Sequence, residues 1–307
     1  MGLEFDRILE PFDGPFETIP YGEEQKHKGS FTKLAGAVGY TFSTKENASY
    51  ILINDLLKEG IEVEKNSEYF YVAASDKATP ILENAAAKYG VKITGVQQKL
   101  NMGAVGLKPN RIALWDVYGG SMPSGWTRWI FEQYHFPFTV LFAKEIDAGN
   151  LKSKYDVILF VGGAIPAFRA EAGSNAMGGY EGREPNEKEI PEMYHAQLGR
   201  ITAAKSIPAL KEFTEAGGTI ITIGSSANLA YHFKLPVRNA LVEMVNGKER
   251  PLPGEKFYIP GSVMQVAVNN KLSANWGMKP TADVYFSASP VFNLLPNATS
   301  SGEITPL

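Results

Sequence analysis

The 307-residue sequence contains no cysteine, which excludes disulfides, thiolate metal sites and a cysteine nucleophile. It has only four histidines, so few side chains could act as a general base or an imidazole metal ligand. A net charge of −3 shows no basic excess, which argues against binding to nucleic acid through phosphate contacts. No apolar run approaches the ~18–20 residues of a transmembrane helix, so no membrane span is expected.

What the sequence does contain is a repeated alternation of helical and extended patterns. Three junctions, LLKEGIEVE, AAKYGVKIT and FTEAGGTIIT, each combine a helix end, a glycine suited to a left-handed C-cap, and a strand. This repeated helix–glycine–strand pattern predicts a layered α/β architecture. We expect an extended arm over residues 1–34, a small α/β domain over 35–105, and a larger domain over 106–307. The polar tail of the larger domain suggests that it is truncated at its C-terminus.

Within the larger domain, three near-continuous apolar strands stand out. The segments RIALWDV (111–117), DVILFV (156–161) and TIITI (219–223) have the pattern of strands buried on both faces. They predict a flavodoxin-like parallel sheet in which the three strands are neighbours. We also expect a strand over FTVLFAKEI (138–146), a helix over 121–136, and a helix over 206–218 capped by Ser206. After residue 250 the pattern becomes rich in strands.

Loops of small residues follow three of these strands. In an open α/β sheet, ligands collect outside the carboxyl ends of the strands, so these loops are the candidate binding site. The candidate ligand-binding residues are Gly119, Gly120, Gly162, Gly163, Ala164, Ser225 and Ser226.

Ser226 is the candidate nucleophile, because it follows a strand at a sharp turn that leads into a predicted helix. The segment Gly224–Asn228 keeps the first glycine of a G-x-S-x-G elbow, but Asn228 replaces the second. A serine nucleophile also needs a histidine base. His232 lies six residues further along the predicted helix, and the other three histidines precede the turn. The alternative is that the serines only cap the helix.

Two Glu-x-x-His pairs, Glu132/His135 and Glu192/His195, could each place a carboxylate and an imidazole on one helix face. Metal sites of that kind need further glutamates on long helices, so we interpret these pairs as coincidence and predict no metal site. Trp126 and Trp129 are three residues apart, which favours core packing. Alternatively, Trp126 could line a pocket with Tyr118 and Met122.

The segments FVGGAI and GGTIITIGSSANLA together resemble class I glutamine amidotransferase-like domains. In that family a glycine-rich loop supplies part of an oxyanion hole and a later turn presents a cysteine. Gly162, Gly163 and Ala164 match the loop, and Ser226 matches the cysteine position. Because the cysteine and the following His-x-Glu pair are both missing, the resemblance does not imply glutaminase activity.

A closer resemblance is to the amidotransferase-like region that follows the catalytic domain in some bacterial zinc carboxypeptidase-like proteins. It rests on RIALWDVYGGSMPSGWTRWIFEQYHFPFTVLFAKEI, on LGRITAAKSIPALKEFTEAGGTIITIGSSANLAYHFKLPV and on FYIPGSVMQVAVNN, and covers about residues 35–295. No histidine here begins the His-x-x-Glu signature of those peptidases. The resemblance therefore implies a non-catalytic accessory region, with the catalytic zinc in a peptidase domain that would lie upstream. It also implies a periplasmic or extracellular parent protein.

Three function classes remain in competition at this point, one of which is a plain structural spacer. The first is the accessory module, which we expect to bind a small carboxylate or a peptide C-terminus weakly at the glycine loops and the helix start. The second is a serine hydrolase or peptidase with Ser226 as nucleophile. Residues 166–191, rich in Gly, Ala and Glu, are expected to form a mobile flap beside the site.

Overall fold

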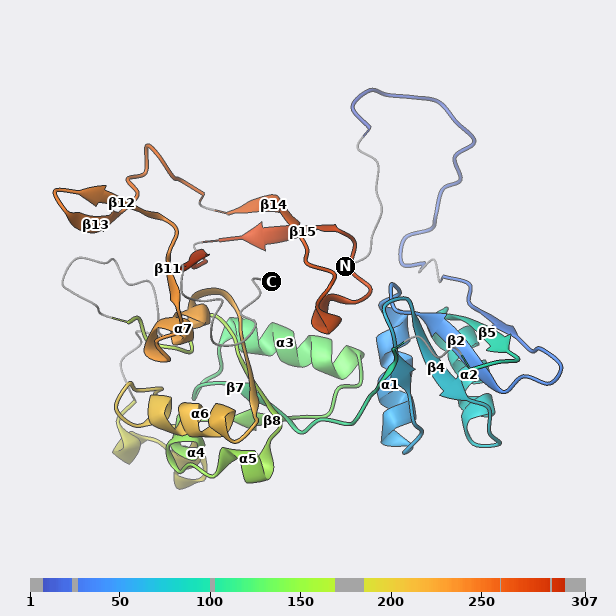
Figure 1. Cartoon of the computed structure of the whole chain (residues 1–307), viewed down its shortest axis with the longest axis horizontal. Helices are drawn as coiled ribbons and strands as arrows, with labels where there is room; N and C mark the ends of the chain where they lie inside the picture. The colour runs from blue at the N-terminus through green and yellow to red at the C-terminus, as the bar shows by residue number, and fades with distance from the viewer. Residues whose placement is uncertain are drawn as a thin grey trace. The chain divides into compact units, whose positions relative to one another are not determined.

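The structure is a computed structural model that describes residues 8–23, 27–99, 103–168, 185–259, 261–287 and 289–295 (Figure 1). The chain divides into two compact units. The first comprises Met1–Pro109, Tyr134–Phe136 and Ala267–Thr281, and the second comprises Asn110–Gln133, Pro137–Val266 and Ala282–Leu307.

The first unit is built on a β-α-β-β-α-β sequence of elements. These are β2 (Gly39–Ser43), α1 (Ala48–Lys58), β3 (Glu64–Lys65), β4 (Tyr69–Ala73), α2 (Ala78–Tyr89) and β5 (Lys92–Val96). The sheet has the order β1-β5-β2-β4-β3-β6, and β2 runs antiparallel to both β4 and β5. This connectivity is that of a ferredoxin-like unit. Alternate residues such as Phe42, Phe70 and Ile93 are fully or almost fully buried, and they share a core with Leu52 and Leu82 of the two helices.

The two outer strands of this sheet extend it beyond the β-α-β-β-α-β core. Strand β1 (Ser30–Thr32) pairs in parallel with β5, and β6 (Val105–Gly106) pairs antiparallel with β3. Residues 30–32 were expected in the extended arm, but their alternating pattern instead extends the sheet. The segment LAGAVGYTF (34–42) has the pattern of a buried strand, but β2 begins only at Gly39.

The second unit contains a four-stranded, fully parallel sheet. Its strands are β7 (Ile112–Trp115), β8 (Phe138–Leu141), β9 (Val157–Phe160) and β10 (Thr219–Thr222). The order is β10-β9-β7-β8 and all three pairings are parallel. The predicted α/β class is confirmed, as is the prediction that the RIALWDV, DVILFV and TIITI strands are neighbours in one sheet.

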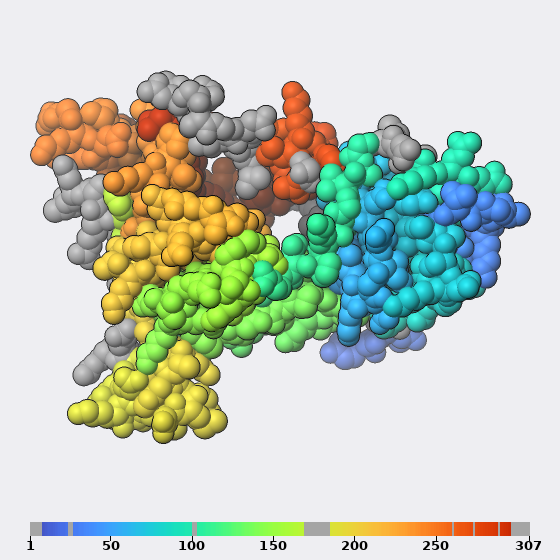
Figure 2. Space-filling model, turned by 60° about the horizontal axis from the view of Figure 1, so that its bottom comes forward, coloured from blue at the N-terminus to red at the C-terminus, as the bar shows by residue number. Residues whose placement is uncertain are grey.

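The helices of this unit lie on the two faces of the sheet according to the direction of each crossover. Helix α3 (Met122–Gln133) lies in the crossover from β7 to β8, which moves toward the β8 edge of the sheet. Helices α4 (Ala143–Asp147), α5 (Leu151–Lys154) and α6 (Ser206–Glu215) lie in the crossovers from β8 to β9 and from β9 to β10, which move toward the β10 edge. Right-handed crossovers therefore put α3 on one face and α4 to α6 on the other, as Figure 1 shows. Figure 2 shows α4 and α5 (green) packed against α6 (gold).

Two local predictions for this unit are wrong. The expected strand over 138–146 ends at Leu141, and Ala143–Asp147 forms α4, because Ala143 and Ile146 bury one helical face. Ser206 does not cap α6. Its buried hydroxyl accepts a hydrogen bond from the Thr202 N–H (2.9 Å) and donates one to Asp147 Oδ1 (2.6 Å).

The region after residue 250 is rich in strands, as predicted, but the strands begin earlier, at Val237, and among the described residues they form two-stranded sheets. These pair β11 (Val237–Asn239) with β16 (Phe292–Leu294), β12 (Val242–Val245) with β13 (Lys248–Pro251), and β14 (Ser262–Ala267) with β15 (Thr281–Phe286). All six residues of β14 are exposed. The positioning of the candidate site therefore depends on the parallel sheet and its helices.

Candidate functional site

The turn that follows β10 places Ser226 inside the protein. The side chain is fully buried, and its hydroxyl donates a hydrogen bond to the Val161 carbonyl. The same oxygen accepts hydrogen bonds from the N–H groups of Ala164 (3.1 Å) and Ile165 (3.3 Å). Ser226 therefore ties the turn after β10 to the loop after β9.

Ser225 makes a second tie between the same two loops. Its hydroxyl oxygen accepts a hydrogen bond from the Gly163 N–H at 2.9 Å. Gly163 (φ +87°) and Gly224 (φ +59°) adopt left-handed conformations that favour glycine. The structure thus brings Gly162, Gly163, Ala164, Ser225 and Ser226 together, as the candidate site requires.

This arrangement changes how the backbone N–H groups of the loop can be used. Those of Gly163, Ala164 and Ile165 all have a serine hydroxyl as acceptor, so a carboxylate could reach them only by displacing Ser225 or Ser226. The helix predicted to follow the turn and to include His232 is present as two short helical segments. A 3-10 helix, η3 (Gly224–Asn228), is followed by the single-turn helix α7 (Leu229–His232). The helix is short because Leu229 is its only buried residue, which gives it little apolar surface to extend.

In the described part of the chain, neither serine hydroxyl is hydrogen-bonded to a histidine. His232 Nε2 lies 2.9 Å from the Pro166 carbonyl oxygen, and His195 Nε2 lies 2.8 Å from the Ile190 carbonyl oxygen. His135 belongs to the first unit, where its Nδ1 lies 2.6 Å from Asp55 Oδ1. The imidazoles that could serve as a base thus have other partners.

The loop after β7 is organised by a carboxylate that sequence analysis missed. Asp116 is almost completely buried, and its Oδ1 accepts hydrogen bonds from the N–H groups of Val117 and Ser121, both at 2.8 Å. Its Oδ2 forms an ion pair with Arg128 of α3. Gly119 and Gly120, between these anchors, have φ values of +83° and +77°. The available signal was an aspartate at the end of an apolar strand with an arginine on the next helix.

Arg128 also brings a guanidinium to the base of a loop whose own sequence contains no basic residue. Arg128 Nε and the Ser124 hydroxyl, one helical turn apart on α3, are buried and have no hydrogen-bond partner among the described residues. Buried polar groups nearly always have partners, so this end of the network has unused hydrogen-bonding capacity.

The two tryptophans of α3 are not core residues, contrary to the packing prediction. Trp126 is 63% exposed, Trp129 is 54% exposed and Met122 is 77% exposed. They are exposed because α3 buries a different face, which carries Ser124, Arg128 and Phe131. Tyr118, proposed to share a pocket with Met122 and Trp126, instead packs against Tyr194 with ring centroids 5.9 Å apart.

Neither Glu-x-x-His pair forms a metal site in the described residues, which contain no group of three or more potential metal ligands. His195 Nδ1 lies 3.5 Å from Glu187, and His135 contacts Asp55.

Within the described residues, no helix is long and apolar enough to cross a membrane. The central part of the expected flap, residues 169–184, lies outside the described residues.

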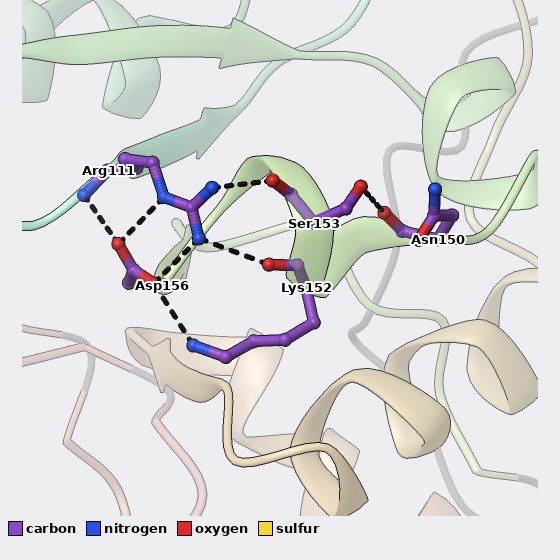
Figure 3. Close-up of polar contacts among 5 residues, drawn as sticks. All are labelled: Arg111, Asn150, Lys152, Ser153 and Asp156. Carbon is purple, nitrogen blue, oxygen red and sulfur yellow. Dashed lines mark hydrogen bonds and ion pairs between the residues drawn. The ribbon is translucent and has the colours of Figure 1, made fainter.

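A charged cluster lies at the opposite, amino end of the parallel strands (Figure 3). Arg111, before β7, donates hydrogen bonds from Nε and Nη2 to both carboxylate oxygens of Asp156, before β9, at 2.9 Å each. Lys152 adds a bond at 3.0 Å, and Arg111 also donates to the carbonyls of Lys152 and Ser153. The hydrogen bonds from Arg111 hold the pKa of Asp156 far below its usual range. This cluster connects the starts of β7 and β9.

Comparison with protein-family models, curated proteins and solved structures gives no match for this chain. The functional argument therefore rests on the geometry of the strand-end loops.

Proposed function

We propose that the chain is a non-catalytic, amidotransferase-like accessory module that supports a zinc carboxypeptidase-like domain in the same protein. The observation that carries this proposal is that the Ser226 hydroxyl serves as a buried hydrogen-bonding group of the backbone. A nucleophile needs an accessible hydroxyl oxygen and a base within about 3 Å. The Ser226 hydroxyl is fully buried and makes three hydrogen bonds to the backbone of residues 161–165.

The finer parts of the proposal follow from the resemblance to peptidase-associated amidotransferase-like regions. The four-stranded parallel sheet would be the central part of a flavodoxin-like sheet. Zinc would be bound by the neighbouring peptidase domain, and the protein would be periplasmic or extracellular. A carboxylate, such as a peptide C-terminus, would bind at the loops only after the serine hydroxyls moved aside.

The competing proposal is a serine hydrolase with Ser226 as nucleophile. It is favoured by the position of Ser226 directly after a parallel strand, where the turn brings it beside the Gly162–Gly163 loop. It would require a second conformation in which Ser226 turns outward and a histidine approaches it.

A fluorophosphonate probe distinguishes the two proposals, because it reacts with activated serines. We expect no labelling of the full chain, with intact-mass detection, at probe concentrations that label a serine hydrolase completely. The Ser226→Ala variant is the matched control for background reaction. Labelling of the unaltered chain that disappears in Ser226→Ala would overturn the accessory-module proposal and establish the hydrolase.

A further inference from the structure

Strand β10 lies at one edge of the parallel sheet, and β9 is its only strand partner among the described residues. The N–H groups of Thr219 and Ile223 donate to the carbonyls of Asp156 and Phe160, each at 2.9 Å. Backbone groups of successive residues in a strand point to opposite edges. The N–H and C=O groups of Ile220 and Thr222 therefore point away from β9, toward the free edge.

This edge carries none of the usual protection against pairing. Residues 217–230 contain no charged residue and no proline. The side chains of Ile221 and Ile223, on one face of the strand, are 48% and 50% exposed. Natural edge strands are commonly guarded by charges, prolines or bulges, so an unguarded apolar edge is suited to pairing with another strand.

We infer that β10 pairs antiparallel with β10 of a second copy of this chain, about a two-fold axis beside Ile221. In this register, Ile220 of one copy faces Thr222 of the other, and the outward backbone groups form four hydrogen bonds. Ile221 faces its own symmetry mate as a non-hydrogen-bonded pair, the type in which side chains approach closest. The two parallel sheets then join into one continuous sheet of eight strands.

Helix α6 is compatible with the same axis, and its charges favour a second copy as the partner. It leads into β10 and packs on the sheet through Leu210 and Phe213. Because α6 is the crossover between β9 and β10 and packs beside β10, the two α6 helices would run antiparallel about 10 Å apart, a helix-packing distance. Lys211 and Glu215 form an exposed ion pair on α6, and an antiparallel copy presents the same charges in the opposite order. Lysine can therefore face glutamate across the axis.

The absence of cysteine from the sequence makes the register directly testable. In an Ile221→Cys variant the two thiols would lie on the axis, where Cα atoms of a non-hydrogen-bonded pair are about 4.5 Å apart, within disulfide range. In the matched control Ile223→Cys, each cysteine would face Thr219 of the other copy. The two thiols would then be about 13 Å apart, too far to bond. Met122→Cys, on the exposed face of α3, controls for random collision.

We expect mild oxidation to convert Ile221→Cys into a disulfide dimer much faster than either control, as seen on non-reducing gels. The unaltered chain should show a concentration-dependent increase from 33.6 kDa toward twice that mass by light scattering. Ile221→Lys and Ile221→Glu should each be monomeric, because like charges meet on the axis. Mixing the two should restore the dimer, which a simple folding defect would not allow.

Three results would overturn the inference. One is a chain that stays at 33.6 kDa at all concentrations and shows no preferential cross-link at residue 221. The second is equal cross-linking of Ile221→Cys and Ile223→Cys. The third is a dimer that forms unchanged in both Ile221→Lys and Ile221→Glu.

Discussion

The two ends of the parallel sheet are held together by different chemistry. At the carboxyl ends, Ser226 and Asp116 are buried; Ser226 accepts hydrogen bonds from the N–H groups of the loop after β9, and Asp116 accepts them from the N–H groups of its own loop. At the amino ends, Arg111 and Asp156 form a partly exposed ion pair that bridges the starts of β7 and β9. When a mutation removes the partner of a buried polar group, water cannot replace the lost interaction. An exposed charge that loses its partner is solvated instead.

The comparison explains why the carboxyl end is arranged as it is. Loops that bind a ligand would leave N–H groups free for it, but here side-chain oxygens use the N–H groups of residues 117, 121 and 163–165. Much of the hydrogen-bonding capacity of the loops at the carboxyl end therefore stabilises the loops themselves. We expect mutations there to affect stability more strongly than mutations at the amino end.

The largest effect is expected for Asp116→Asn. The substitution keeps an oxygen for the Val117 and Ser121 N–H groups but removes the charge that pairs with Arg128. Breaking a buried ion pair by neutralising one partner costs about 3–5 kcal/mol, and because the Arg128 side chain is 35% exposed we expect the lower end of this range, about 3 kcal/mol. Urea unfolding at neutral pH measures the loss. The control is Asp156→Asn at the amino end, and an equal loss in both variants would contradict the difference between the two ends.

The next largest effect is expected for Ser226→Ala. Alanine fits the space but leaves the N–H groups of Ala164 and Ile165 without their acceptor in a buried loop. The expected loss in the free energy of unfolding is about 2 kcal/mol. Ser225→Ala is the matched neighbour, because it frees only the Gly163 N–H and should cost about 1 kcal/mol. Equal stability of Ser226→Ala and the unaltered chain would show that these hydrogen bonds are not formed in solution.

Most of the fold could be predicted from periodicity, because buried parallel strands have a distinctive apolar pattern. The segments 111–117, 156–161 and 219–223 show this pattern, and all three form neighbouring strands. The errors occur where a short apolar segment fits two structures. In FTVLFAKEI the apolar character of β8 continues past Leu141. Only the tertiary packing of Ala143 and Ile146 decides that residues 143–147 form a helix.

The candidate site was predictable in its location but not in its hydrogen bonding. Glycines and serines at strand ends correctly indicated that the loops after β9 and β10 meet. The sequence could not reveal that the hydroxyls of Ser225 and Ser226 would accept from residues 163–165, because these partners are more than sixty residues away. Asp116 and Arg128 were missed for a related reason. An aspartate after a strand is also typical of solvent-exposed turns, so its burial depends on the position of α3.

The smallest effect is expected for Asp156→Asn, and this effect should depend on pH. Because hydrogen bonds from Arg111 depress the folded-state pKa of Asp156, its contribution to stability is complete above its unfolded pKa of about 4. The contribution is lost as the pH falls below that value toward the folded-state pKa. Since Asp156 is 28% exposed and Arg111 50% exposed, we expect a loss of only about 1 kcal/mol at neutral pH.

Urea unfolding of the unaltered chain and Asp156→Asn at pH 7 and at pH 3 tests this expectation. The difference in the free energy of unfolding should be largest at pH 7 and smaller at pH 3, where the Asp156 carboxyl of the unfolded chain becomes protonated while that of the folded chain stays charged. Asp13→Asn, at an exposed aspartate outside the helices and strands, should show little difference at either pH. A difference for Asp156→Asn that grows on acidification would mean that the Arg111 bridge does not favour the charged carboxylate. The amino end of the sheet would then be stabilised by packing rather than by the ion pair, and the proposed difference between the two ends would be wrong.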